Sequence, residues 1–242
     1  MKLLDPDCTS LRDEMDVLAQ ALGAHALPDE RARSILEIGC GKGEMTRRIA
    51  ERWPGGNVAA TEVDKIQLAK NQQSNQHRNI QYLYGAAEAI PFADQSFDAV
   101  LLFKSFHHVP TALMDRAIDE IHRVLRPGGI AYFCEPVFSG PFNEITRLFH
   151  DEEQLRKIAF DALVKASADP RWAAVDEYHY LVSVRFVDFD DFERRIMRVT
   201  HNDLDLNEQL VAKVRQRFEA YAAVHGSSFI RPMRADVFKK SP

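Results

Sequence analysis

The chain has 242 residues, of which 45% are hydrophobic and 28% are charged. These values are ordinary for a soluble globular protein, and the length suits a single α/β domain with additions. The formal net charge of −5 gives no sign of the basic surface that nucleic-acid-binding proteins carry. We therefore expect no nucleic-acid partner.

Neither the N-terminal residues nor the cysteines indicate export or membrane insertion. In the opening segment MKLLDPDCTS, acidic residues and a proline follow only two leucines, so the apolar run is too short for a secretory signal. Apolar runs stay well below the roughly 18 residues of a membrane span. Cys8, Cys40 and Cys134 stand apart, which disfavours a disulfide framework or a cysteine zinc site. These features predict a cytoplasmic protein without membrane association.

The first 33 residues are predicted to be helical. Ser10 and Asp13 have a spacing suited to a capping box. Apolar residues share one face of the expected helix: Leu11, Met15, Leu18 and Leu22. Such a helix would either pack on the flank of the domain or close over its site, and the sequence leaves both interpretations open.

From Ser34 onward, short apolar runs alternate with segments of helical periodicity. The runs are SILEI, NVAAT, IQYLY, FDAVLLF and GIAYFC. This pattern predicts a parallel sheet with helices on both faces. The runs are nearly continuous, as expected for strands that are buried on both sides. Residues 126–129, RPGG, should end one helix and lead into the fifth strand.

After Cys134 the alternation stops. Residues 139–175 have the periodicity of helices, and HYLVSVRFVDF has the character of a strand. FDDFERRIMRV and LNEQLVAKVRQRFEAYAAV predict two further helices, and SFIRPMRADVFKK predicts a final strand. The sequence contains neither an internal repeat nor a recognisable linker, so this region should dock on the first part as one domain.

Three glycines follow the first predicted strand, in ILEIGCGKGEMT. A glycine turn between a strand and a helix lets backbone N–H groups approach a nucleotide closely. A dinucleotide site has the spacing GxGxxG. Here Gly43 comes one residue early and Glu44 occupies the sixth position. The spacing therefore disfavours a pyrophosphate site.

An acidic residue near the end of the second predicted strand suits a ribose. In NVAATEVD, Glu62 lies about at the strand end, where a carboxylate can accept both ribose hydroxyls. Asp64 is the competing acid, but counting back from Leu68 favours Glu62. Asp64 is better suited as the N-cap of the following helix.

Four ordered segments resemble the motifs of class I S-adenosylmethionine-dependent methyltransferases. They are LEIGCGKGEMT, ATEVDKIQLAK, GAAEAIPFADQSFDAVLLFKSFHHV and EIHRVLRPGGIAYFCEP, within about residues 34–136. The similarity is strongest to the small-molecule branch that includes the quinone-biosynthesis C-methyltransferases. This resemblance implies a Rossmann-like α/β fold with a seven-stranded, mostly parallel sheet, and S-adenosylmethionine as cofactor.

The resemblance also assigns roles to matching positions. It implies that the methionine part and the ribose are framed by Glu37, Gly39, Cys40 and Gly41. It implies further that Glu62 binds the ribose hydroxyls, that Val63 packs on adenine, and that Phe103 and Lys104 lie near the methionine moiety. The family usually has GDAE where this chain has GAAE, so Ala86 cannot supply the acidic side chain that meets adenine. The backbone of Ala86 and Ala87 remains available for that contact, and Glu88 is a candidate to compensate.

In such an enzyme the cofactor brings an electrophilic methyl group, and the protein aligns it with the acceptor. His107 and His108 follow the fourth predicted strand, near where the methyl group would emerge, and a neutral imidazole suits a general base. Because HHV recurs in this family with different substrates, a structural role stays open. Lys104 would bind an anionic substrate or extend its amine to solvent.

The sequence predicts no metal. A divalent-metal methyltransferase of the catechol type needs carboxylates after the fourth and the fifth strands. Glu135 follows the fifth strand, but no acid lies between Phe103 and Pro110.

Substrate contacts should come from outside the resemblance, from residues 1–33 and 139–183. Aromatic residues in and beside the second segment suit a flat or apolar substrate: Phe138, Phe142, Phe149, Tyr178, Tyr180 and Phe186. Core packing is nevertheless the favoured role of most of them. Arg231 and Arg234 are suited to clamp a carboxylate, or they face solvent.

The sequence thus predicts one methyltransferase domain over residues 1–242. Residues 1–33 would form a helical segment, 34–136 the cofactor-binding core, 139–183 a helical substrate-capping insertion, and 184–242 the remaining strands and helices. The predicted reaction is in-line methyl transfer to O, N or C of a small aromatic or anionic molecule, by a monomer or homodimer. The alternatives are a catalytically silent cofactor-binding partner subunit and, less favoured, an NAD-dependent oxidoreductase.

Overall fold

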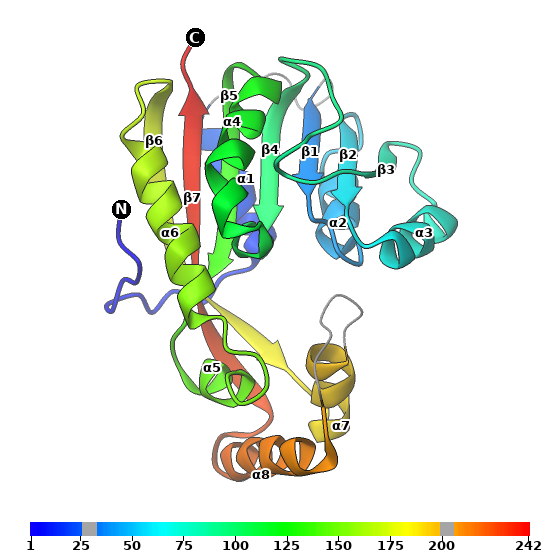
Figure 1. The fold of residues 1–242 in the computed structure, drawn as a ribbon, viewed down its shortest axis with the longest axis vertical. Helices are drawn as coiled ribbons and strands as arrows, with labels where there is room; N and C mark the ends of the chain where they lie inside the picture. Colours follow the sequence, from blue (N-terminus) through cyan, green and yellow to red (C-terminus); the bar gives the residue numbers. More distant parts are fainter. Residues whose placement is uncertain (26–32, 199–205) are drawn as a thin grey trace.

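The computed structural model describes residues 1–25, 33–198 and 206–242. In these residues the chain builds a seven-stranded sheet of order β3-β2-β1-β4-β5-β7-β6 (Figure 1). The strands are β1 Ser34–Ile38, β2 Asn57–Glu62, β3 Ile80–Tyr84, β4 Phe97–Phe103, β5 Leu125–Pro136, β6 Trp172–Arg185 and β7 Ser228–Lys240. β1 to β5 are parallel, whereas β7 is antiparallel to both of its neighbours. The predicted mostly parallel sheet is confirmed.

Helices cover both faces of this sheet, as the sequence predicted. They are α1 Glu14–Ala24, α2 Glu44–Arg52, α3 Lys65–Ser74, α4 Met114–Val124 and α6 Glu153–Ser167, with 3₁₀ turns η1 Phe106–His108 and η2 Thr111–Leu113. Successive strand side chains point to opposite faces. Ile35 therefore packs in the core beneath α1, α2 and α3, while Leu36 packs in the core beneath α4 and α6. Burial on both faces explains the continuous apolar runs of the central strands.

The N-terminal helix is shorter than predicted. The carboxylate of Asp13 accepts the N–H of Met15 at 2.8 Å, so Asp13 rather than Ser10 is the N-cap of α1. Leu11 lies before the helix, with 60% of its surface exposed. The apolar face of α1 packs on the flank of the sheet, where Leu18 is fully buried. The prediction also included residues 26–32, which lie outside the described residues.

Below the sheet, β6 and β7 continue as a two-stranded ribbon into a separate group of helices (Figure 1). β5 ends at Pro136, whereas β6 and β7 stay paired as far as Arg185 and Ser228. The ribbon carries α5 Pro141–Thr146, α7 Phe189–Phe192, a π-helical turn η3 Glu193–Met197 and α8 Glu208–His225. We call residues 137–149, 182–198 and 206–231 the lower unit. Its buried residues form a core of their own: Phe142, Ile145, Phe186, Phe189, Phe192, Met197, Val214, Phe218 and Phe229.

Several elements in the second half differ from their predicted bounds. β5 already begins at Leu125, so residues 126–129 are part of the strand that they were expected to precede. β6 begins at Trp172, inside the segment predicted to be helical. Residues 139–183 are therefore divided among three places: α5 lies in the lower unit, α6 packs beside α4, and β6 joins the sheet.

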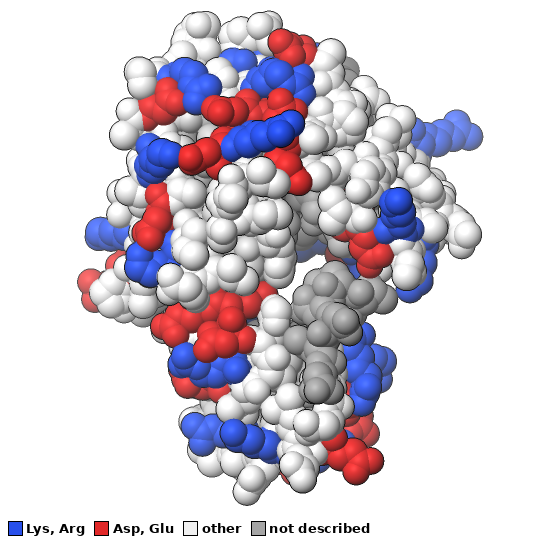
Figure 2. All heavy atoms as spheres, in the orientation of Figure 1, with Lys and Arg blue, Asp and Glu red and all other residues white. Residues whose placement is uncertain are grey.

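The charged side chains on the face that carries α4 and α6 are of mixed sign. Figure 2 shows Lys and Arg interspersed with Asp and Glu over these helices. Several are paired, as in Arg123 with Asp94 at 2.8 Å and Arg171 with Asp119 at 2.8 Å. Of the helices in the described ranges, none combines the length and apolar character that crossing a membrane requires.

Candidate active site

The residues that the resemblance assigned to the cofactor gather at the carboxyl ends of β1, β2 and β4. The strand order reverses between β1 and β4, because β2 lies on one side of β1 and β4 on the other. In open α/β sheets, the crevice outside such a switch point is the usual ligand site. The sheet therefore places these residues where a nucleotide is expected.

The turn of residues 39–43 is held closely against its neighbours. The N–H groups of Gly39 and Cys40 both donate to the carbonyl of Thr61, at 2.9 and 3.0 Å. Gly39 has φ +69°, and a Cβ there would lie 2.8 Å from Cβ of Ser105. Gly43 has φ +68°, and its Cβ would lie 2.5 Å from the hydroxyl of Tyr82. Glycine is required at both positions by conformation and by space.

Glu62 lies beside this turn, at the end of β2, with its carboxylate fixed by backbone hydrogen bonds. One oxygen accepts the N–H of Gly41 at 2.7 Å, and the other accepts those of Val63 and Asp64 at 2.8 and 2.9 Å. Asp64 caps α3 by accepting the N–H of Ile66 at 2.9 Å, as the sequence predicted. Of the two acids, Glu62 is thus the one oriented at the turn.

A second carboxylate, Glu37, is buried under the turn. The hydroxyl of Thr46 donates to it at 2.5 Å. Burial raises the pKa of Glu37 to about 7, against the opposing effects of Thr46 and Lys104. Cys40, next to it in space, is also buried, and burial raises the pKa of its thiol well above the usual range. The thiol therefore remains protonated.

Three large apolar side chains are exposed at the ends of β2 and β3 and in the first turn of α3. Val63, Ile66 and Tyr84 are 53%, 63% and 54% exposed, although large apolar residues are mostly buried in this chain. Val63 is the residue that the resemblance places against adenine. Ala86 and Ala87 follow β3, and the carbonyl of Ala86 accepts the N–H of Ala89 at 3.2 Å.

Lys104 has a partner that the sequence did not reveal. Its ammonium group donates to both carboxylate oxygens of Glu14, at 2.7 and 2.8 Å. Its charge is therefore paired within the protein, and this ion pair ties the end of β4 to α1. Phe103, the residue before it, is buried against Tyr132.

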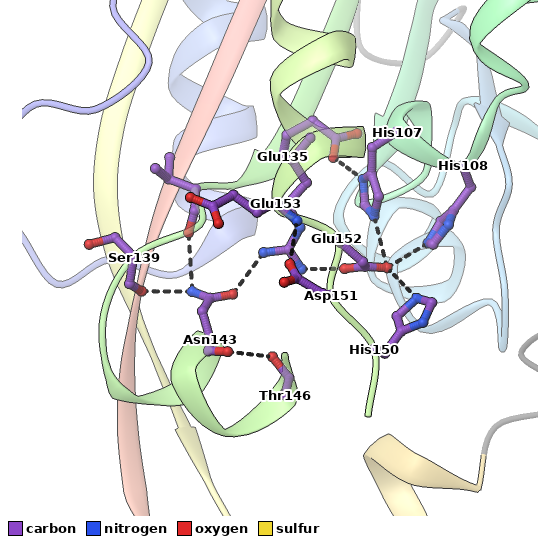
Figure 3. A network of polar contacts seen from close by, with 12 residues as sticks. His107, His108, Glu135, Ser139, Asn143, Thr146, His150, Asp151, Glu152 and Glu153 are labelled. Carbon is purple, nitrogen blue, oxygen red and sulfur yellow. Dashed lines mark hydrogen bonds and ion pairs between the residues drawn. The ribbon is translucent and has the colours of Figure 1, made fainter. Parts of the chain in front are cut away.

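The two histidines after β4 have different surroundings (Figure 3). His107 is buried, and its Nδ1 is paired with Glu135, which also accepts the N–H of Phe106 at 2.9 Å. Burial lowers the pKa of His107, but Glu135 and Glu152 outweigh that effect and raise it to about 9. The ring is then an imidazolium at neutral pH, which argues against His107 as a general base. The His108 side chain is 42% exposed.

Glu152, which lies just before α6, connects both histidines to a wider polar network (Figure 3). Its Oε1 lies 3.6 Å from Nε2 of His107, 3.9 Å from Nε2 of His108 and 2.9 Å from Nε2 of His150. Its Oε2 accepts from Arg156 at 2.5 Å. Donor atoms of His107, His108 and Glu152 all lie within 4.8 Å of one another, an arrangement that can hold a metal ion.

The prediction of no metal depended only on acids close to the fourth and fifth strands. Glu152 and His150 lie more distantly in the chain, and only the fold brings them to the histidines. The segment HDEE at residues 150–153 contains candidate metal ligands, but its distance along the sequence gives no indication that it lies beside His107.

Most of the predicted aromatic contacts serve core packing, the role that the sequence favoured. Phe142 and Phe186 belong to the core of the lower unit, and Tyr180 is buried with its hydroxyl 3.0 Å from Sγ of Cys134. Arg234 is buried and donates to Asp236 at 2.7 Å, so it neither clamps a ligand nor faces solvent. Arg231 lies over the ring of Phe142, 4.6 Å from its centre.

A cavity of about 510 Å³ lies elsewhere, between α5 and α8. Its lining comes from the lower unit: Gly140, Pro141, Glu144, Ile145, Arg217, Ala220, Tyr221, Val224 and His225. Because this lining includes none of the residues gathered at the carboxyl ends of the strands, we do not place the active site there.

Comparison with known proteins agrees with this geometry. The family described as methyltransferase domain matches residues 36–133, which run from β1 into β5. Over these residues the chain is similar to the methyltransferase family.

The curated relatives of the methyltransferase domain include quinone-biosynthesis enzymes. Ubiquinone/menaquinone biosynthesis C-methyltransferase UbiE of Hahella chejuensis is 34% identical over 49% of this chain and 48% of its own length. Demethylmenaquinone methyltransferase of Chlorobaculum parvum is 32% identical over 59% of this chain and 58% of its own. The chain thus spans about half the length of the curated relatives it matches.

Solved structures resemble almost the whole chain at low sequence identity. A putative methyltransferase of Bacillus halodurans has a TM-score of 0.60 at 19% identity, with 94% of this chain and 100% of that chain covered. The [4+2]-cyclase SpnF has a TM-score of 0.57 at 19% identity, with 99% and 86% covered. These likenesses concern the fold alone, and the second shows that the fold also occurs in a protein named for another reaction.

Proposed function

We propose that this protein transfers a methyl group from S-adenosylmethionine to a small organic molecule. The observation that carries the proposal is the position of Glu62, a carboxylate fixed by three backbone N–H groups beside the turn of residues 39–43. A ribose needs an acid at this point of the sheet. The methyltransferase domain over residues 36–133 supports S-adenosylmethionine as the nucleoside that brings this ribose.

In this proposal the remaining parts of the cofactor meet residues already gathered at the site. Adenine would lie against the exposed side chains of Val63, Ile66 and Tyr84, next to the backbone of Ala86 and Ala87. The methionine part would follow the glycine turn toward Glu37 and Phe103. A nearby positive charge favours ionisation of a buried acid, so Glu37 would become a carboxylate when the cationic cofactor binds.

When bound, S-adenosylmethionine supplies an electrophilic methyl group, so the protein's task is alignment and exclusion of water. If the acceptor must lose a proton, His108 is the candidate base of the predicted pair, because His107 is paired with Glu135. His107 would then hold the end of β4 in place. Catalysis by His108 remains a prediction.

The substrate class that we propose is a small anion. Arg231 has no carboxylate within 4.0 Å in the described part of the chain, and its Nε is buried without a hydrogen-bond partner. A buried guanidinium without a carboxylate partner is suited to bind the carboxylate or phosphate of a ligand. α5, α7 and α8 of the lower unit would then act as the substrate cap, a different set from the predicted residues 139–183. We place the protein in the cytoplasm, in keeping with its three free thiols.

Calorimetry tests the cofactor. The wild-type protein should bind S-adenosylmethionine and its demethylated product, whereas NAD should give no saturable heat. Replacing Glu62 with alanine should weaken cofactor binding by about 1–3 kcal/mol, the cost of losing charged hydrogen bonds. Asp64→Ala is the matched control: it removes a helix cap and about 1 kcal/mol of stability, and it should leave the dissociation constant unchanged. Equal affinity of Glu62→Ala and wild type would contradict the assignment.

The reaction needs a second experiment, because a silent homologue would also bind the cofactor. The purified chain is incubated with methyl-labelled S-adenosylmethionine and a metabolite extract, and labelled products are identified by mass spectrometry. We expect a labelled small anion whose yield falls in Arg231→Met and not in the exposed variant Arg217→Met. Cofactor binding without any labelled product would favour the catalytically silent partner subunit, which the GAAE sequence at residues 85–88 also suggests.

A further inference from the structure

We infer that His107, His108 and Glu152 form a binding site for one divalent transition-metal ion, for which Zn²⁺ is best suited. The donor atoms are Nε2 of each histidine and Oε1 of the glutamate (Figure 3). We call these three residues the histidine site. The inference concerns metal binding by this chain and does not depend on methyl transfer. With the ion bound, His108 would be a ligand and no longer a candidate base.

The donor atoms are already close to the spacing that a metal would impose. Zinc bonds of about 2.0–2.1 Å in a tetrahedral arrangement place neighbouring donors about 3.4 Å apart. Oε1 of Glu152 lies 3.6 Å from Nε2 of His107 and 3.9 Å from Nε2 of His108. Both separations exceed ordinary hydrogen-bond lengths, so the carboxylate faces the two rings without bonding closely to either. These two separations need shifts of only a few tenths of an ångström, and all three donor atoms lie within 4.8 Å of one another.

His107 provides an independent indication that a ligand belongs here. The residue is 2% exposed, and its Nε2 is buried without a hydrogen-bond partner in the described part of the chain. Its other nitrogen, Nδ1, is paired with Glu135. A carboxylate bound to the far nitrogen of a histidine is the usual support of a metal-ligating ring, because it orients the ring and directs Nε2 at the ion, which displaces the proton from that nitrogen on binding.

Glu152 is supported in the same way. Arg156 donates to its Oε2 at 2.5 Å, and Arg156 is itself held by Oδ1 of Asn143 at 2.8 Å. His150 lies 2.9 Å from Oε1, where its ring N–H can donate to one lone pair of that oxygen while the other stays directed at the site. These contacts fix the carboxylate for binding through one oxygen.

The donor set selects the class of metal. Two imidazoles and one carboxylate suit zinc and its neighbours in the first transition row, whereas Mg²⁺ prefers oxygen donors throughout. Two histidines, one glutamate and an open position form a donor set known from catalytic zinc sites. The site also has an entrance, because the side chains of His108 and His150 are 42% and 30% exposed while that of His107 lies beneath them at 1%.

The experiment measures zinc directly on the full chain. After treatment with a chelator, the protein is titrated with Zn²⁺ in competition with a chromophoric chelator, and bound metal is counted by elemental analysis. We expect one Zn²⁺ per chain and no competition from an equal concentration of Mg²⁺. His108→Ala and Glu152→Gln should each weaken Zn²⁺ binding at least tenfold. His225→Ala, an exposed histidine on α8, is the matched control and should bind as wild type.

Cobalt provides a readout that a merely structural ion-pair network would not give. Co²⁺ bound to the wild-type protein should show the visible absorption of a four-coordinate nitrogen and oxygen site, and His108→Ala should lack it. His108 is half-exposed, so this variant is expected to fold, which circular dichroism checks. Failure of the wild-type chain to bind one equivalent of Zn²⁺ would overturn the inference. So would unchanged binding in folded His108→Ala and Glu152→Gln, which would leave only a network of ion pairs.

Discussion

Position 39 requires glycine both for its left-handed backbone and for lack of space for a Cβ atom, and comparison with Gly41 separates these two effects. Gly39 has φ +69° and would place a Cβ 2.8 Å from that of Ser105, whereas Gly41 has φ +51° and nothing within 4 Å of its Cβ position. A left-handed conformation alone costs an alanine about 1–2 kcal/mol. Gly41→Ala should therefore lose about that much stability, and Gly39→Ala should lose clearly more because Ser105, just after β4, must also move. Chemical denaturation measures both, and equal losses would contradict the close approach.

Glu37 should make the stability of the protein depend on pH. Its pKa is raised from 4.5 to about 7 by burial, so the folded state holds the proton more tightly than the unfolded chain. The free energy of unfolding should therefore fall as the pH rises from about 4.5 to about 7. Glu37→Gln stays neutral and should lose this slope, whereas Glu51→Gln on the surface should keep it. Parallel slopes in wild type and Glu37→Gln would show that the acid is ionised in the folded state.

At the scale of single residues, the sequence predicts local partners and misses distant ones. The cap at Asp64 follows from the next few residues, and Glu62 follows from its place at a strand end. The pair of Lys104 with Glu14 joins positions 90 residues apart, and neither residue type identifies the other. The raised pKa of His107 depends likewise on Glu135 and on Glu152, which only tertiary packing brings near.

At the scale of elements, α1 is stabilised by the burial of its apolar face against the sheet. Leu18 is fully buried in the core beneath the sheet, whereas Leu11, predicted to share its face, lies before the helix and is 60% exposed. Truncating a buried leucine costs about 2–5 kcal/mol, and an exposed side chain usually costs less than about 0.5. Thermal or urea unfolding should thus separate Leu18→Ala from Leu11→Ala. Similar losses in both would mean that α1 extends further toward the N-terminus.

The elements from β1 to β4 were predictable because each is a short apolar run between clear turn residues. The start of β5 was not, because Pro127, Gly128 and Gly129 are turn residues that here lie inside a strand beside a register shift. The start of β6 was also missed. Its residues 172–178 alternate little in polarity and, apart from Trp172, are exposed or half-buried at an edge of the sheet, so their pattern does not differ from that of a surface helix.

At the scale of the whole molecule, the chain has a separate core in the lower unit, with its own cooperative contacts. Phe192 is fully buried there among other aromatic rings. Replacing it with alanine should cost about 3–5 kcal/mol, mainly as local opening. Hydrogen exchange should become faster in α8 and stay slow in β4. Val187→Ala, at a position 85% exposed, is the control. Equal acceleration in β4 would show that both parts unfold as one.

The ribbon between the two parts gives the molecule a particular mechanical property. Both backbone groups of Leu181 bond to Ser10 and Arg12, so its pair with Pro232 in β7 exchanges no hydrogen bonds. The missing N–H of Pro232 therefore falls on the side where β5 has just ended, and the strand tolerates the proline. Below that level two strands continue without a third, and two-stranded ribbons twist more readily than wide sheets. This two-stranded ribbon is thus the paired backbone connection between the sheet and the lower unit, so a change in its twist would tilt the lower unit relative to the sheet.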